Sequence, residues 1–265
     1  MLVMKFGGAS VATPESFLKI AEIIIEQANA NESVAVVVSA MGNATDQLFK
    51  LACQVNQDPP RRELDMLVSA GERISIALLA MALAAKGREA VSFTGSQSGI
   101  ITDDVHSDAK IIDVRPYRIA NVLKQGKIAI VAGFQGVSRN GEITTLGRGG
   151  SDTTAVALAI ALNSPSVVFY KDVPGIFNAD PKQDPQAQLI PKISYEEAYA
   201  LALQGAKVLQ ARSIALAEKN GIVLSIRSFE RHRDIGTIVG EEGCRDIFEK
   251  SIYETEEWRH VGSTT

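Results

Sequence analysis

The stretch Gly147-Arg148-Gly149-Gly150-Ser151-Asp152 contains residue types that could bind an anion. Glycines let a backbone turn tightly and approach a ligand closely. Ser151 and Asp152 are good N-cap residues, so we expect a helix to begin beside them. Free amides at a helix N-terminus attract anions, and the guanidinium of Arg148 suits a carboxylate or a phosphate. Taken alone, the stretch is equally typical of a glycine-rich turn with a surface arginine.

A second glycine pair follows Lys5. Residues 1–6 read as a buried strand, Gly7-Gly8 as a turn, and a helix is expected from about Thr13, with Pro14 at its first position. A strand, a glycine turn and a helix form an arrangement that can cradle phosphate. The spacing matches neither a dinucleotide fingerprint nor a Walker A loop, and in isolation Lys5 is more simply a solvated lysine at a strand end.

Small polar residues also follow the β-branched run 34–38, which is typical of a parallel strand covered on both faces. Ser39 ends that strand, and Thr45 and Asp46 fall in the first turn of the next helix. Ligands gather at the carboxyl edge of such sheets, which favours a binding role. Plain helix capping is the alternative for each residue alone.

A long helix is predicted over 61–86, and Gly71 lies within it beside Glu72. A glycine inside a helix costs about 1 kcal/mol relative to alanine, which suggests that another group approaches closely there. Glu72 could bind an ammonium group. The alternative is a surface ion pair with Arg73 or a lysine.

The segment after the strand 166–170 has no helical period and contains the breaks Pro174-Gly175 and Asp180-Pro181. Phe177 and Lys182 could therefore face a ligand. A planar phenylalanine can stack on a base, although it can equally fill a core.

The remaining pattern predicts the architecture. Apolar strands alternate with helices, which indicates an α/β protein of three layers with a mostly parallel sheet. Asn140-Gly141 predicts a hairpin with a type I′ turn. We expect an irregular hairpin or lid over 100–115, whose acidic residues form a solvated face. Further helices are expected over 194–203 and 206–219.

Composition excludes several classes of protein. The chain has 265 residues, 46% hydrophobic and 22% charged, which suits a globular core. A formal net charge of -4 argues against electrostatic binding of nucleic acid. We find no apolar run that would span a bilayer and no leader-like segment. Cys53 and Cys244 lack disulfide or metal spacing, and three scattered histidines disfavour a metal site, so we expect a cytoplasmic protein without a protein-bound metal cluster.

Several segments, in order, resemble the amino acid kinase family, and within it the aspartate kinases. They are KFGGASV (5–11), SAMGNATD (39–46), SAGERIS (69–75), FTGSQSG (93–99), VAGFQG (131–136), TTLGRGGSDTTA (144–155), YKDVPGIFNADPK (170–182) and GAKVL (205–209). The resemblance implies transfer of the γ-phosphoryl group of ATP to the side-chain carboxylate of L-aspartate, the first step of lysine, threonine and methionine biosynthesis. Mg²⁺ would ride mainly on the phosphates.

The resemblance also implies roles for individual residues. The catalytic pair would be Lys5 and Asp152, with Asp152 orienting Lys5. The aspartate-binding residues would be Ser39, Thr45, Glu72, Arg148, Gly149, Gly150 and Ser151, with Glu72 at the α-ammonium and Arg148 at the α-carboxylate. The ATP-binding residues would be Lys5, Phe6, Gly7, Gly8, Tyr170, Lys171, Asp172, Phe177, Asp180, Lys182 and Lys207, with Phe177 against adenine.

The same resemblance implies a domain layout. A catalytic domain would cover 1–240, with an amino-acid side at about 1–150 and a nucleotide side at about 151–240, followed by a loosely held tail over 241–265. Relatives usually continue into ACT regulatory domains, and this chain stops where they would begin. We therefore expect insensitivity to lysine and threonine, unless a separate regulatory chain supplies that site. A homodimer is also left open.

Three positions depart from the family pattern. Lys171 replaces a usual threonine or serine, Phe177 a usual tyrosine, and Lys182 a usual arginine. We therefore expect Lys171→Thr to lower the KM for ATP. Two alternatives to an aspartate kinase stay open: a relative that phosphorylates glutamate or N-acetylglutamate, and a non-catalytic binding subunit. Glu72 disfavours an acetylated substrate, and the set of Lys5, Arg148 and Asp152 disfavours the subunit.

Overall fold

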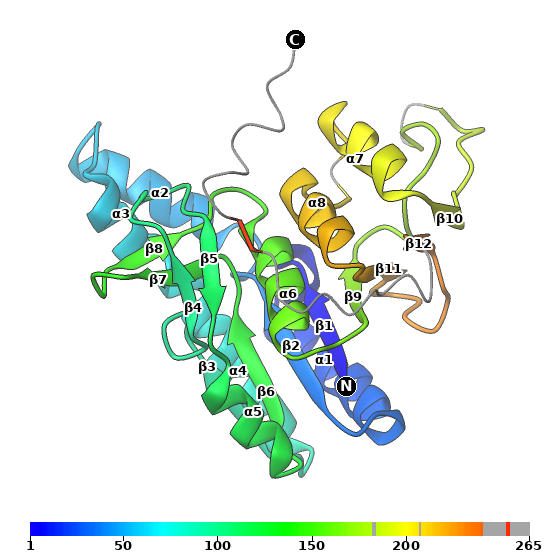
Figure 1. The fold of residues 1–265 in the computed structure, drawn as a ribbon, viewed down its shortest axis with the longest axis horizontal. Helices are drawn as coiled ribbons and strands as arrows, with labels where there is room; N and C mark the ends of the chain where they lie inside the picture. Colours follow the sequence, from blue (N-terminus) through cyan, green and yellow to red (C-terminus); the bar gives the residue numbers. More distant parts are fainter. Residues whose placement is uncertain (182–183, 207, 241–252, 255–265) are drawn as a thin grey trace.

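An eight-stranded sheet lies at the centre of the described chain (Figure 1). The computed structural model describes residues 1–181, 184–206, 208–240 and 253–254. Paired neighbours are parallel except β11 and β12. In spatial order the strands are β10 (Lys192–Ile193), β12 (Thr237–Val239), β11 (Val223–Ser228), β9 (Ser166–Lys171), β1 (Leu2–Phe6), β2 (Val34–Val38), β6 (Ile128–Ala132) and β3 (Ala90–Phe93).

Helices cover both faces of this sheet and confirm the predicted three layers. Along β1, Met4 and Phe6 belong to one core cluster and Val3 to the other, as alternation along a strand requires. On the Met4 side lie α1 (Pro14–Ala30) and α4 (Ala70–Ala85). On the Val3 side lie α5 (Tyr117–Lys124), α6 (Gly150–Ala161) and α8 (Ala211–Lys219), with α7 (Tyr195–Leu203) packed on α8.

A smaller sheet stands beside the central one, on the left of Figure 1 with α2 (Ala44–Val55) and α3 (Arg61–Val68). Its strands, in spatial order, are β5 (Ile111–Val114), β4 (Ile100–Thr102), β7 (Gln135–Ser138) and β8 (Ile143–Thr145). The antiparallel pair β4–β5 confirms the hairpin expected over 100–115. Helix α3 packs against β8 of this sheet.

The β7–β8 hairpin exists, but its predicted type I′ turn is wrong. Gly141 has a φ of 84°, whereas Asn140 is not among the residues with positive φ, and a type I′ turn needs both. The Gly141 amide donates to the Ser138 carbonyl and the Ser138 amide to the Glu142 carbonyl. This is a three-residue loop with glycine at the left-handed position.

Two helix predictions had the wrong bounds. The stretch 61–86 divides at Ser69, whose carbonyl accepts a hydrogen bond from Gln135 Nε2 at 2.9 Å. The helix expected over 206–219 begins only at Ala211, because Gly205, with φ 105°, ends α7 and Gln210 is extended. By contrast, Thr13 caps α1 as predicted, and Ser194 caps α7 in a capping box with Glu197.

The helical stretch Arg61–Ala85 is long and apolar enough to cross a membrane by length and composition alone, although Glu72 and Arg73 interrupt its apolar residues. Half of its most apolar 18-residue window is buried inside the protein, and Leu79 and Leu83 belong to the core. A core helix passes the same test, so this stretch is weak evidence for a membrane span.

The close approach predicted at Gly71 is confirmed, and the approaching group is Ala40. A Cβ at this position would lie 2.8 Å from the Cβ of Ala40. We expect Gly71→Ala to destabilise the protein by about 1–2 kcal/mol, because overpacking outweighs the gain of about 1 kcal/mol in helix propensity. Urea unfolding measures the loss. The double variant Gly71→Ala/Ala40→Gly should recover most of it; equal losses in the single and double variants would contradict the contact.

Candidate active site

A pocket of about 840 Å³ opens at the carboxyl edge of the central sheet, facing the smaller sheet. It collects residues that follow β1, β2 and β8 and the first turns of α2 and α6. Of the residues predicted for the site, it is lined by Lys5, Gly8, Ser39, Thr45, Glu72, Arg148, Gly149, Gly150, Ser151, Asp152 and Lys171. The fold thus brings together eleven positions from segments as distant as β1 and β9.

Two lysines share one carboxylate in this pocket. Lys5 Nζ lies 2.6 Å from Asp152 Oδ1, and Lys171 Nζ lies 2.9 Å from Oδ2 and 3.3 Å from Oδ1. Lys5 comes from β1, Lys171 ends β9 beside it, and Asp152 stands in the first turn of α6 above both. All three side chains are largely buried. The parallel pairing of β1 with β9 therefore places two ammonium groups on one side of the sheet.

Burial and charge act on this cluster together. Burial lowers the pKa of Lys5 to about 8, an effect that Asp152 opposes and Lys171 reinforces. Burial alone would raise the pKa of Asp152, but the ammonium groups of Lys171 and Lys5 outweigh it and lower the pKa to about 2. Asp152 is therefore ionised across the physiological range, with two cations on its oxygens.

The glycine stretch forms the turn into α6 in a way that the sequence did not predict. The N-cap is Gly149, with φ 74°, and no side chain caps the helix; Ser151 and Asp152 lie inside its first turn. Gly147 also has a φ of 75°, which suits glycine. Gly133 leaves room for Ser151, since a Cβ there would lie 2.6 Å from its side chain.

Arg212 of α8 anchors the start of this glycine stretch. Its guanidinium donates to the Leu146 carbonyl at 2.6 Å, to the Ala109 carbonyl at 2.9 Å and to Asp108 at 3.1 Å. Glu254 accepts from Arg212 at 2.8 and 2.9 Å and from the Ile111 amide at 3.0 Å. Tyr253 and Glu254 are buried, so the loose tail expected over 241–265 is wrong for these two; its other residues lie outside the described chain.

Glu72 is buried in the pocket wall, so the alternative of a surface ion pair with Arg73 or a lysine is wrong. Only 2% of the residue is exposed. Its Oε1 accepts from the Ala40 amide at 3.2 Å, and Oε2 has no hydrogen-bond partner within the described chain. Burial raises the pKa of Glu72 to about 8. A cation placed at Oε2 would relieve this cost.

Arg148, unlike Glu72, is almost fully exposed to solvent. Its side chain is 93% exposed and lies 3.5 Å from Asp46 of α2. Asp46 and Thr45 stand in the first turn of α2, where the structure shows no side-chain cap, so the capping alternative is wrong there. An exposed guanidinium that lines the pocket and is paired only at this long distance can exchange Asp46 for a ligand anion.

Several residues predicted for ATP lie away from the pocket. The rings of Phe6 and Tyr170 stack on each other with centroids 4.6 Å apart and are fully buried on the α1 side of the sheet. Their side chains are core, which leaves the backbone for a nucleotide. Gly7, Asp172, Phe177 and Asp180 do not line the pocket either. Lys182 and Lys207 lie outside the described residues.

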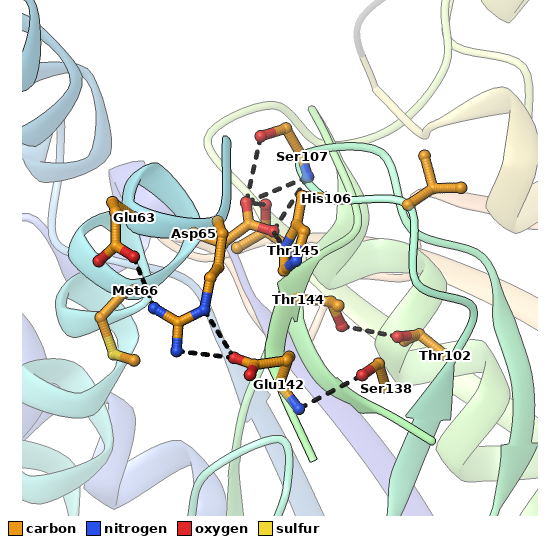
Figure 2. A network of polar contacts seen from close by, with 12 residues as sticks. Glu63, Asp65, Met66, Thr102, His106, Ser107, Ser138, Glu142, Thr144 and Thr145 are labelled. Atoms are coloured by element: carbon orange, nitrogen blue, oxygen red, sulfur yellow. Dashed lines mark hydrogen bonds and ion pairs between the residues drawn. The ribbon is translucent and has the colours of Figure 1, made fainter. Parts of the chain in front are cut away.

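Asp65 is a pocket residue that the sequence analysis missed. Fully buried in α3, it accepts hydrogen bonds from His106 Nδ1 at 2.8 Å, from the amide and hydroxyl of Ser107, and from Thr145, whose hydroxyl lies at 2.6 Å (Figure 2). It fastens the β4–β5 hairpin and β8 to α3 beside the pocket. Its helical spacing from buried Val68 was the one signal available.

These features define the class of protein. The model of the amino acid kinase family matches residues 1–228, and the chain belongs to this family. In the part of the chain that is described, no group of three or more His, Cys, Asp or Glu residues could hold a metal ion.

Particular relatives narrow the comparison. The chain is 49% identical to an aspartokinase of Bacillus sp. (strain MGA3) over 91% of its own length and 59% of that protein. It is similar to the crystal structure of aspartate kinase from Synechocystis, with a TM-score of 0.81 and 46% identity over 90% of this chain and 39% of the other. E. coli aspartokinase III in complex with aspartate and ADP has a TM-score of 0.81 and 27% identity over 91% and 65%. The chain thus spans about three fifths of the curated relative's length.

The raised pKa of Glu72 predicts a pH-dependent stability. Its folded pKa of about 8 exceeds the ordinary glutamate value of 4.5, so between these pH values only the folded state holds the proton. The free energy of unfolding should fall as pH rises through this window, by an amount on the order of a few kcal/mol. Glu72→Gln should remove that fall and be more stable than the unliganded wild type at pH 8.

Urea titrations from pH 5 to pH 8 measure this difference. Glu63→Gln is the matched control, because Glu63 is an exposed partner of Arg62 on the neighbouring helix α3. If Glu72→Gln is no more stable than the wild type at pH 8, the buried carboxylate is not held at a cost.

Proposed function

We propose that this chain carries the activity of an ATP-dependent aspartate kinase, which transfers the γ-phosphoryl group to the side-chain carboxylate of L-aspartate and yields 4-phospho-L-aspartate and ADP. The carrying observation is the charge pattern of the pocket. The pocket contains the buried carboxylate of Glu72, which has one oxygen without a hydrogen-bond partner in the described chain. It also contains two lysines that are both paired with Asp152. An amino acid that offers an ammonium group and receives a phosphoryl group matches that pattern.

The amino-acid side of the site is assigned to residues before about 150. Glu72 Oε2 accepts from the α-ammonium, and this charged hydrogen bond offsets the cost of its burial. Arg148 binds the α-carboxylate from the pocket mouth. Ser39, Thr45 and the backbone of Gly149 to Ser151 complete the contacts. Similarity to the E. coli enzyme in complex with aspartate and ADP supports this assignment.

The nucleotide side is assigned to β1 and to about 151–240. Lys5 neutralises charge on the transferring group, with the Gly7-Gly8 backbone beside it, since phosphoryl transfer depends on positioning and electrostatics. Asp152 holds Lys5 in place. The segment 170–182, with Asp172, Phe177 and Asp180, holds the nucleotide, and Lys182 and Lys207 add positive charge. Mg²⁺ accompanies the phosphates and supplies further neutralisation when bound.

The wider setting follows from this activity. The product feeds amino-acid biosynthesis, and the cytoplasm holds the ATP that the reaction needs. Cys53, a free thiol in the described chain, agrees with that compartment. A homodimer and a separate regulatory chain stay predictions.

Release of ADP, measured by a coupled assay with aspartate, glutamate and N-acetylglutamate side by side, tests the proposal. We expect turnover with aspartate alone. Preference for glutamate or N-acetylglutamate would mean that the chain is a kinase of that acid and not of aspartate. No ADP release with any of the three acids would favour a non-catalytic subunit.

Lys5→Ala should reduce turnover to less than a few per cent of wild type and leave aspartate binding largely intact, because the lysine meets charge that develops in transfer. Steady-state rates and calorimetric aspartate binding measure the two effects. Lys19→Ala is the control, since Lys19 pairs with Glu230 on the surface. Turnover that survives in Lys5→Ala would exclude the assigned role.

Arg148→Lys should raise the KM for aspartate roughly 10-fold or more with a smaller change in kcat, because an ammonium group cannot make the paired hydrogen bonds of a guanidinium. Arg115→Lys is the matched control, as Arg115 pairs with Asp113 away from the pocket. An unchanged aspartate KM would mean that another group binds the α-carboxylate.

A further inference from the structure

Lys171 occupies a position that its sequence context did not explain. The resemblance treats it as a replacement for a hydroxyl residue at the nucleotide, which led to the expectation that Lys171→Thr would lower the KM for ATP. In the structure its ammonium group turns to Asp152 instead, at 2.9 Å from Oδ2 and 3.3 Å from Oδ1. Only 13% of the side chain is exposed, so the contact is a largely buried ion pair and not one of the weak pairs found on protein surfaces.

The arrangement has a consequence for the charge of the site. Lys5 and Asp152 alone would form a neutral pair, and the field of Lys5 would be largely cancelled at short range. Lys171 takes the second oxygen of the same carboxylate, so two ammonium groups and one carboxylate carry a net charge of +1. In a largely buried cluster this difference is weakly screened by solvent. A transferring phosphoryl group meets a cationic cluster rather than a neutral one.

The pairing also fixes geometry. A carboxylate that accepts from a cation on each oxygen has little freedom to rotate, and Lys5 is held by one of those oxygens. The two lysines approach Asp152 from neighbouring parallel strands, so the backbone pairing of β1 with β9 sets their separation. Removing Lys171 would free Asp152 to give both oxygens to Lys5.

We propose that Lys171 is a positioning residue for phosphoryl transfer, which holds Oδ2 of Asp152 while Lys5 holds Oδ1, and leaves the Lys5–Asp152–Lys171 cluster with a net positive charge. The proposal rests on the proposed kinase function. It predicts that Lys171 acts on kcat through Lys5, and it reverses the expectation for Lys171→Thr.

The test compares Lys171→Met, which removes the charge, Lys171→Thr, which carries the residue usual in relatives, and Lys171→Arg, which keeps the charge. We expect kcat to fall at least about 10-fold in Lys171→Met and Lys171→Thr, with the KM for ATP changed less than about 3-fold, since the lost interaction acts in the transition state. Lys171→Arg should recover most of kcat. Lys110→Met, at a surface pair with Asp108, is the control.

A second readout needs no turnover. Lys5 faces Asp152 from α6 and Lys171 from β9, and Glu72 and Arg148 line the same pocket. Because Lys171 lowers the pKa of Lys5, Lys171→Met should raise it. NMR titration of protein labelled at the lysine ε-carbon, with Lys5→Arg identifying the signal, measures this pKa. The alkaline limb of the kcat profile should move to higher pH with it.

The outcomes are distinct. A raised KM for ATP with unchanged kcat would make Lys171 a direct nucleotide ligand and overturn the proposal. So would an unmoved Lys5 titration, or a loss of kcat in Lys171→Arg as large as in Lys171→Met. If Lys171→Met does not fold, Lys171→Thr and Lys171→Arg decide the question. A wild-type chain that releases no ADP with aspartate would defeat the proposed function, while the Lys5 titration would still judge the role of Lys171.

Discussion

The buried ion cluster at Asp152 is the interaction on which the rest of the site depends. Two charged lysines and a carboxylate are costly to remove from water, and such a cluster persists only when each charge is paired at short range. The fold supplies this through three elements that meet at one edge: β1 delivers Lys5, β9 delivers Lys171, and α6 delivers Asp152. The glycine turn before α6 and the clamp of Arg212 on Leu146 fix where that helix begins.

Glu72 shows the same exchange between stability and function at the other side of the pocket. An ionised carboxylate with an unpartnered buried oxygen weakens the unliganded fold, and its pKa of about 8 expresses that cost. The α-ammonium group of the proposed substrate would supply the cation that the described chain does not place at this oxygen. The neighbouring part of the pocket wall is held together by Asp65 of α3, which accepts hydrogen bonds from the β4–β5 hairpin and from β8.

The sequence predicted what local pattern determines. Unbroken apolar strands gave the three layers, and glycine turns at strand ends led to Lys5, Arg148 and Asp152 in one pocket. Features set by distant partners escaped it. The resemblance places Lys171 at the nucleotide, because its bond to Asp152 depends on how β9 and α6 pack together, and no local pattern singles out Asp65. Capping preferences favour Ser151 and Asp152, but the left-handed Gly149 is the N-cap of α6.

In the proposed reaction a γ-phosphoryl group reaches the side-chain carboxylate of aspartate in this pocket. Acyl phosphates react with hydroxylamine to give stable hydroxamates, so the product of isotope-labelled aspartate can be trapped and identified by mass spectrometry. We expect the β-hydroxamate of aspartate, formed in step with ADP by the wild type and absent with Lys5→Ala. ADP release without that hydroxamate, or a hydroxamate at the α-carboxylate, would contradict the proposed reaction.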